Sequence, residues 1–279
     1  MACYICVTCG VQFSQTSTPP ESCPICEDER QYVGHDGQQW TTLAELKQKH
    51  QNRIERQTNG LYGIGTEPSF AIGQRSLLVQ TEQGNVMWDC ISLIDDETVE
   101  QVRELGGVGA IAISHPHYYA SAIEWAHAFD AKVYLHAADR QWMMRPDPLV
   151  KFWTGDTLKL QESITLIKAG GHFAGGTVCH WAGHRAEGLE GAGILLTGDV
   201  IQVVADKRWV SFMYSYPNFI PLSASKVRHI VEAVEPYSFE RIYGAWWTAI
   251  VSSDAKESIR RSAKRYIAAI QEEVKEAAT

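Results

Sequence analysis

Two histidines separated by one residue follow a short apolar run in the middle of the chain. His115 and His117 come directly after residues 110–114, whose composition predicts a buried strand. Side chains at positions i and i+2 of an extended chain point the same way, so both imidazoles can reach one metal ion. Histidine is a common zinc ligand, and this pair is therefore a candidate metal site.

A third histidine and an aspartate occupy turns that also follow predicted strands. His172 lies in the glycine-rich turn 170–176, and Asp199 closes a later apolar run. Alone, a histidine at a strand end or a Gly-Asp pair is more often a structural feature of a turn. Together the four residues predict one metal held by His115, His117 and His172, with Asp199 as a further candidate ligand.

The N-terminus carries a second candidate metal site made of cysteines. Cys6 and Cys9 form one CxxC pair, and Cys23 and Cys26 form another. Two such turns supply the tetrahedral set of four sulfurs that zinc or iron accepts. Cys3 stands one CxxC step before Cys6 and is a possible competitor. We expect a structural zinc ribbon rather than an electron-transfer iron site.

The elements that must position these residues are short strands alternating with helices, a pattern typical of layered α/β folds. We expect a metal ribbon over residues 1–38 with too few apolar residues for its own core, a connecting helix over 39–58 (periodic at 41–56), and an α/β domain over 59–279. Strands are predicted at 76–79, 86–89, 110–114, 132–136, 164–168, 193–196 and 241–243, helices at 95–105, 121–129, 224–234 and 253–278, and an exposed hairpin loop at 181–193.

The order of the candidate residues resembles the metallo-β-lactamase superfamily over residues 60–250. That family has an aspartate after an early strand, an HxH motif, a histidine in a glycine-rich turn and a late aspartate. These correspond here to Asp89, His115 with His117, His172 and Asp199. The resemblance implies a four-layer αββα sandwich with the site at one edge of its sheets. The cysteine segment resembles the rubredoxin-like knuckle of rubrerythrins over about 30 residues.

The chain departs from the family pattern where the second metal of the family is held. Tyr119 and Ala120 replace the Asp-His that follows the HxH motif, and residues 241–247 contain no final histidine. The late aspartate of the family, to which Asp199 corresponds, bridges both metals. Because the other ligands of the second metal are missing, we expect a single metal in the large domain. Zinc is the preferred metal and iron is the alternative.

A zinc ion with an open position lowers the pKa of its bound water to about 7, which suits hydrolysis of an ester, thioester, lactone or amide. Asp199 could ligate the metal or accept a proton from the water. We expect Asp89 to orient a histidine ligand from behind. Tyr119 could donate a hydrogen bond to a developing oxyanion, and the alternative for Tyr119 is simple packing.

Two other functions compete with hydrolysis. His115, His172 and Asp199 match the ligands of the persulfide dioxygenase branch of the same superfamily, and two histidines with one carboxylate are typical of non-haem iron oxygenases. The missing ligands also allow a non-catalytic binding protein. Metal content separates this last reading from the two enzymes.

An aromatic segment follows Asp199. Trp209, Tyr214 and Tyr216, together with Trp246, could wall a substrate pocket, or the segment could simply pack between sheet and helix.

The charge and composition exclude several classes of partner. The net charge is −8, which argues against nucleic acid as a partner. No apolar run of about 18 residues predicts a membrane span, and the first ten residues do not resemble a secretion signal. We therefore expect a cytoplasmic protein with a small-molecule substrate; the sequence does not indicate an oligomeric state.

Overall fold

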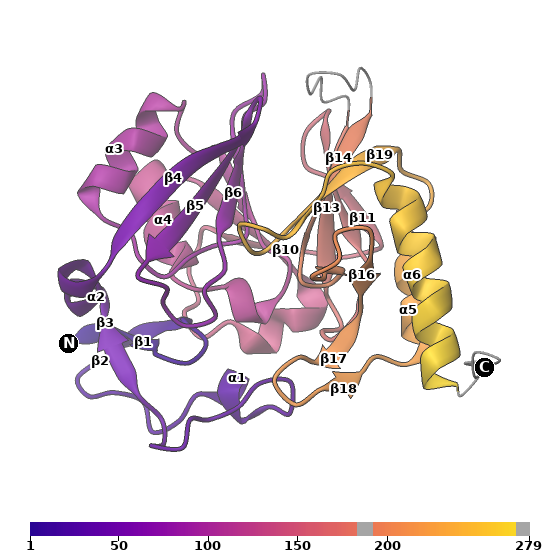
Figure 1. Ribbon diagram of the computed structural model, residues 1–279. Helices are drawn as coiled ribbons and strands as arrows, with labels where there is room; N and C mark the ends of the chain where they lie inside the picture. The colour runs from indigo at the N-terminus through magenta and orange to yellow at the C-terminus, as the bar shows by residue number, and fades with distance from the viewer. Residues whose placement is uncertain (183–191, 272–279) are drawn as a thin grey trace.

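Two β-sheets lie face to face in the computed structural model, which describes residues 1–182 and 192–271 (Figure 1). The first sheet has seven strands in the order β10-β9-β8-β7-β6-β5-β4, and the second has six in the order β11-β12-β13-β14-β19-β20. The strands of the first are β4 (Gln51–Thr58), β5 (Leu61–Glu67), β6 (Ser76–Val79), β7 (Val86–Trp88), β8 (Ala110–Ala112), β9 (Lys132–His136) and β10 (Val150–Trp153). Those of the second are β11 (Thr157–Lys159), β12 (Ile164–Lys168), β13 (Thr177–Trp181), β14 (Gly193–Gly198), β19 (Phe239–Gly244) and β20 (Ile250–Val251).

Helices cover the outer face of each sheet. α3 (Asp96–Glu104) and α4 (Ala122–Phe129) lie on the first sheet, and α5 (Ala224–Val234) and α6 (Ala255–Ile270) lie on the second (Figure 1). Trp88 of the first sheet and Leu166 and Leu196 of the second share the core between the sheets. Separate cores fill the space beneath each helix pair. The predicted four-layer αββα sandwich is thereby confirmed.

The N-terminal segment forms a small sheet of its own with the strand order β2-β1-β3. It comprises β1 (Ala2–Cys6), β2 (Gln12–Thr16), the single-turn helix α1 (Pro24–Glu27) and β3 (Trp40–Thr42). We call residues 1–38 the knuckle. Val11 and Ile25 of the knuckle are fully buried, but they belong to the core that also includes residues of α4. The knuckle is thus packed onto the large domain.

The predicted helix over 41–56 is wrong in its second half. α2 (Leu43–Lys49) begins at a capping box in which Thr42 and Glu45 exchange hydrogen bonds. After His50 the chain enters β4, which pairs with β5 along its whole length. Ile54 fits the helical period of Leu43 and Leu46, but it belongs to this edge strand. Pairing with a neighbouring strand overrode a weak local pattern.

The remaining elements lie in the connections. They are the 3₁₀ turns η1 (Pro116–Tyr118) and η2 (Ala137–Trp142) and the short strands β15 (Gln202–Val203), β16 (Val210–Ser211), β17 (Met213–Ser215) and β18 (Ile220–Pro221). Most of the hairpin expected at 181–193 and the end of the last predicted helix lie outside the described residues. Within the described ranges, no helix is long and apolar enough to cross a bilayer.

Candidate metal centre

The predicted ligands follow the ends of strands in both sheets. β8 leads into an extended His115, and Pro116 then starts η1, on which His117 lies. His172 sits in the turn after β12, where Gly170 and Gly171 have positive φ values of 70° and 100°. Such backbone is easy only for glycine, which explains the glycine-rich sequence of this turn. Asp199 directly follows β14.

Four buried donor atoms from these residues converge. The ligand atoms of His115, His117 and His172 all lie within 4.8 Å of one another. Oδ1 of Asp199 is 3.2 Å from Nε2 of His115 and 3.8 Å from Nε2 of His172. Within the described part of the chain, the three Nε2 atoms and Asp199 Oδ1 have no hydrogen-bond partner. Buried polar atoms are rarely left unpaired, so this set fits a divalent metal such as zinc.

The protonation states also suit metal binding. Burial lowers the pKa of all three histidines, that of His172 to about 3, so the imidazoles are neutral and have free lone pairs. Burial raises the pKa of Asp199 to about 7, because nothing in the chain compensates its charge fully. A bound cation would favour the ionised carboxylate.

Asp89 supports the histidine loop from behind, at the end of β7. Its Oδ1 accepts a hydrogen bond of 2.7 Å from the backbone N–H of Ser114, and the Ser114 hydroxyl lies 2.9 Å from Nδ1 of His115. Gly198 approaches this pair so closely that a Cβ there would lie 2.6 Å from the Ser114 hydroxyl oxygen. Asp89 therefore acts on His115 through Ser114 and not by direct contact.

Tyr119 does not face the histidines, so its predicted role as an oxyanion donor needs a correction. It lines a separate small cavity with Val11 and Met144. Its neighbour Tyr118 has its ring 4.4 Å from that of His115. The Tyr118 hydroxyl is buried, and the nearby Asp199 carboxylate adds to burial in raising its pKa. The 3₁₀ turn directs Tyr118, not Tyr119, toward the site, which strand-like spacing after the HxH motif could not predict.

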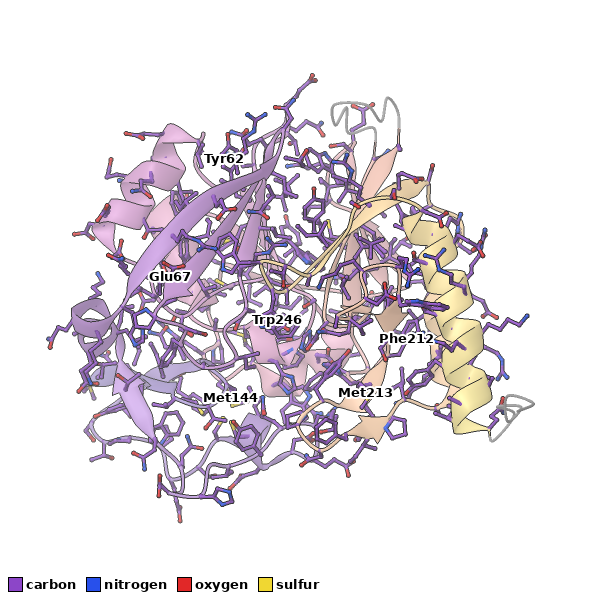
Figure 2. The ribbon with its side chains drawn as sticks, viewed as in Figure 1. Tyr62, Glu67, Met144, Phe212, Met213 and Trp246 are labelled. Carbon is purple, nitrogen blue, oxygen red and sulfur yellow. The ribbon has the colours of Figure 1, made fainter. Side chains whose placement is uncertain are left out.

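A cavity of about 300 Å³ opens beside the four donors. Its wall includes His117, Asp199, Tyr216 and Trp246, and the Tyr216 hydroxyl donates a hydrogen bond to the backbone oxygen of Asp199. Figure 2 shows Trp246 in the middle of the view, between the two halves of the sandwich. Two of the four predicted pocket aromatics, Tyr216 and Trp246, thus line this cavity.

The other two predicted pocket residues are elsewhere. Trp209 lines a different hollow, with Asp254, and packs under the guanidinium of Arg265 at 3.6 Å. The Tyr214 hydroxyl binds the carboxylate of Glu29 in the knuckle. Both aromatics make contacts between separate elements and do not line the cavity.

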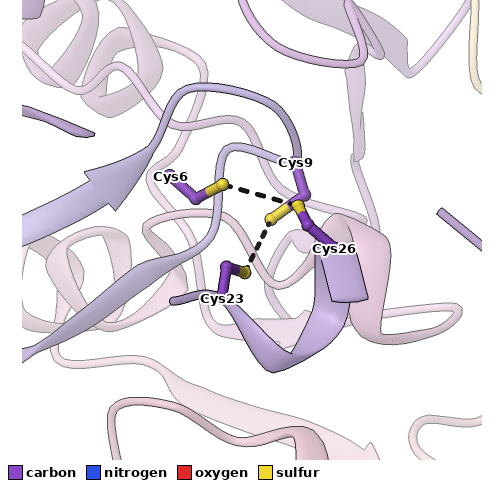
Figure 3. Close-up of side chains that lie close together, drawn as sticks. All are labelled: Cys6, Cys9, Cys23 and Cys26. Carbon is purple, nitrogen blue, oxygen red and sulfur yellow. Dashed lines mark hydrogen bonds between the residues drawn. The ribbon is translucent and has the colours of Figure 1, made fainter. Parts of the chain in front are cut away.

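The four cysteines form a second, closed cluster (Figure 3). The Sγ atoms of Cys6 and Cys26 are 3.5 Å apart, and those of Cys9 and Cys23 are 3.7 Å apart. All four side chains are buried and their sulfurs lie within 4.8 Å of one another, whereas Cys3 is not part of the cluster. The arrangement is consistent with a zinc knuckle.

The knuckle reaches into the cavity, which the sequence did not predict. Thr8, Arg30, Gln31 and Tyr32 line it together with the residues of the large domain. Thr8 lies within the first CxxC pair, whereas no motif surrounds the other three residues, and the positions of all four depend on how the knuckle docks. Only an expectation that small metal ribbons pack against a neighbouring surface could have directed attention to them.

A family model described as the metallo-β-lactamase superfamily matches residues 71–246, which is more than half of the chain. The chain belongs to the metallo-β-lactamase superfamily. An uncharacterised relative, YmaE of Bacillus subtilis (strain 168), is 52% identical over 276 residues, which cover 98% of this chain and 99% of the relative.

Solved metallo-β-lactamases share the fold at low sequence identity. VMB-1 has a TM-score of 0.60 and 13% identity, covering 79% of this chain and 98% of its own. A B3 enzyme with an active-site glutamic acid has a TM-score of 0.55 and 18% identity, with coverages of 80% and 92%. FIM-1 from Pseudomonas aeruginosa, in a mono-zinc form, has a TM-score of 0.56 and 12% identity, with coverages of 77% and 95%. At such identities the likeness concerns the fold alone.

Proposed function

We propose that this protein is a hydrolase that uses one metal ion to cleave an ester, thioester, lactone or amide bond in a small molecule. The observation that carries the proposal is the set of four buried donor atoms without hydrogen-bond partners in the described part of the chain, placed beside a cavity of about 300 Å³. We expect this activity in the cytoplasm.

A single metal is favoured by the residues that surround the histidines. Tyr119, at a position where the family has an acidic ligand, points into another cavity. Ala120 offers no ligand atom, and Trp246 stands in the segment where a last histidine is expected. Among the described residues, only the two groups already named bring three or more ligand side chains together.

The chain's own groups have separable roles in this mechanism. Zinc bound by the histidines would supply a water molecule of lowered pKa and polarise a carbonyl oxygen. Asp199 lies close enough to the ligand atoms to bind the metal or to take a proton. The buried Tyr118 hydroxyl lowers the pKa of the Asp199 carboxylate and so favours its ionised form, and the Tyr216 and Trp246 rings would form a wall beside the acyl group.

The test combines metal analysis with a substrate panel. The zinc-loaded full chain and the His117→Ala variant are assayed against p-nitrophenyl esters, acyl thioesters, lactones and anilides, with His127→Ala as control because that histidine is exposed on α4. We expect hydrolysis of at least one class by the wild type and control and its loss in His117→Ala. Iron in the site would favour the oxygenase, and a large domain that binds no metal would leave a binding protein.

A further inference from the structure

The segment of the knuckle that follows its last cysteine runs along the mouth of the cavity. Figure 1 shows α1 and the chain after it extending beneath the sandwich toward β17 and β18. Asn218, in the turn between these strands, donates from its side-chain nitrogen to the backbone oxygens of Glu29 at 2.9 Å and Gln31 at 3.2 Å. The knuckle segment is therefore held against the second half of the sandwich.

Arg30 joins this segment to the histidine turn. Its Nη1 donates a hydrogen bond of 2.8 Å to the backbone oxygen of His172, and its guanidinium lies 4.0 Å from the centre of the Phe173 ring. The remaining guanidinium nitrogens bind the Asp28 carboxylate. Although Arg30 lines the cavity, its charge is already paired. It positions the segment and leaves no free cation for an anionic substrate.

Gln31 is the nearly buried polar side chain of the segment that remains free to bind a substrate, whereas Tyr32 is 53% exposed. The residue is only 7% exposed, and it lines the cavity together with His117 and Asp199. Its backbone N–H and C=O are paired with Asp28 and Asn218. Its side-chain amide has no hydrogen-bond partner in the portion of the chain that the structure describes. The Gln31 amide is not among the enclosed polar atoms without a partner, so it reaches the open space of the cavity, where a ligand or water can satisfy it.

The rest of the wall defines what kind of molecule could satisfy it. Ile72, Pro217 and Trp246 offer apolar surface on the other walls, and the only cationic side chain among the lining residues is the paired Arg30. The cavity thus combines an apolar surface, one free amide and, apart from Asp199 beside the histidines, no unpaired charge. This combination suits a small neutral acyl group that carries an amide or a second carbonyl.

We propose that Gln31 is a specificity-determining residue that hydrogen-bonds an amide or carbonyl in the acyl part of the substrate, and that the knuckle serves to hold it there. The substrate class is then a small, uncharged N-acylamino ester or thioester. This proposal rests on the proposed hydrolase function. It assigns part of substrate recognition to the knuckle. Gln31 lies five residues after Cys26, so the cysteine cluster fixes the start of the segment that carries it.

The experiment uses two esters with acyl chains of equal length. The p-nitrophenyl ester of N-acetylglycine carries the amide, and p-nitrophenyl pentanoate lacks it. One net hydrogen bond predicts that wild-type kcat/KM favours the amide-bearing ester by about tenfold after correction for the intrinsic reactivity of the two esters. Gln31→Leu should abolish this preference without loss of metal. Gln101→Leu, a matched change on the exposed face of α3, should keep it.

A binding measurement separates failure of this proposal from failure of the hydrolase function. N-acetylglycine hydroxamate and pentanohydroxamate, both metal-binding probes, are titrated into the zinc-loaded proteins while tryptophan fluorescence is followed. The same preference should appear in the wild type and vanish in Gln31→Leu. Preference for the amide-bearing hydroxamate without ester hydrolysis would reject the hydrolase and keep the role of Gln31. The role of Gln31 would be overturned if the wild type bound both hydroxamates with equal affinity, or if Gln31→Leu kept the preference. It would also be overturned if neither hydroxamate bound.

Discussion

The cysteine cluster and the histidine cluster each gather four donor atoms, but only one of them borders a cavity. The four sulfurs lie within the packed core beneath α4. The histidine nitrogens and Asp199 Oδ1 adjoin a cavity of about 300 Å³, which His117 and Asp199 help to line. Four protein ligands close a coordination sphere and stabilise a fold, whereas three histidines beside a cavity leave a position for a reactant.

The two clusters also differ in what their removal should do. The cysteines belong to a segment that contributes Val11 and Ile25 to the main core, so they stabilise the whole chain. His115 is supported by Asp89 through Ser114, which does not depend on the knuckle. We therefore expect loss of stability from one cluster and loss of activity from the other.

The largest effect is expected from Cys9→Ser. Structural zinc contributes on the order of 10 kcal/mol to folding in isolated zinc fingers, and Cys9 is fully buried. Even part of this loss should lower the thermal midpoint by more than about 10 °C, measured by circular dichroism or calorimetry. Cys3→Ser is the matched control and should unfold like the wild type, because Cys3 lies outside the cluster. A Cys9→Ser variant with wild-type stability would contradict a structural knuckle.

An intermediate effect is expected from Asp89→Ala. This change removes the carboxylate that holds the Ser114 N–H, and through it the orientation of His115. Residues that support metal ligands typically contribute about 10–100-fold to metal affinity. We expect a weakening of this size at the histidine site, measured by competition with a chromogenic chelator. The cysteine site should be unaffected; an equal weakening at both sites would indicate general unfolding instead.

The smallest effect is a difference in kcat between variants of two neighbouring tyrosines, Tyr118 and Tyr119. Tyr118→Phe removes a buried hydroxyl near the Asp199 carboxylate that lowers the pKa of that group, and we expect kcat to fall by about tenfold when this polar interaction is lost. Tyr119→Phe changes a side chain in another cavity and should leave kcat within about twofold. Steady-state kinetics of both variants on one p-nitrophenyl ester measure the two kcat values. The reverse order would restore Tyr119 to the site.

The sequence predicted the parts of this account that depend on local spacing. The CxxC pairs, the HxH motif, His172 and Asp199 were found because a metal demands particular residue types at particular distances. Most expected strands and helices appear within one or two residues of their predicted ends. The helix predicted over the residues of β4 is wrong because this strand is stabilised by pairing with β5 and not by the preferences of its own residues.

The parts that depend on docking could not be predicted. Arg30 and Gln31 lie in a polar segment without a motif, and they reach the cavity only because the knuckle packs across its mouth. Tyr118 and Tyr119 are indistinguishable by composition, and a single 3₁₀ turn decides which of them faces the histidines. Trp209 was a reasonable pocket candidate, but it packs against Arg265 of α6.

The most direct test of the central claim is the metal content of the zinc-loaded full-length wild type and its His115→Ala variant, measured together with ester hydrolysis. With one metal in each cluster, the wild type should hold about two metal ions per chain, and His115→Ala about one, with hydrolysis lost and the thermal midpoint lowered by less than in Cys9→Ser. A His115→Ala variant that keeps both metal ions, or that loses one and still hydrolyses the ester at the wild-type rate, would contradict a catalytic metal at the histidine cluster.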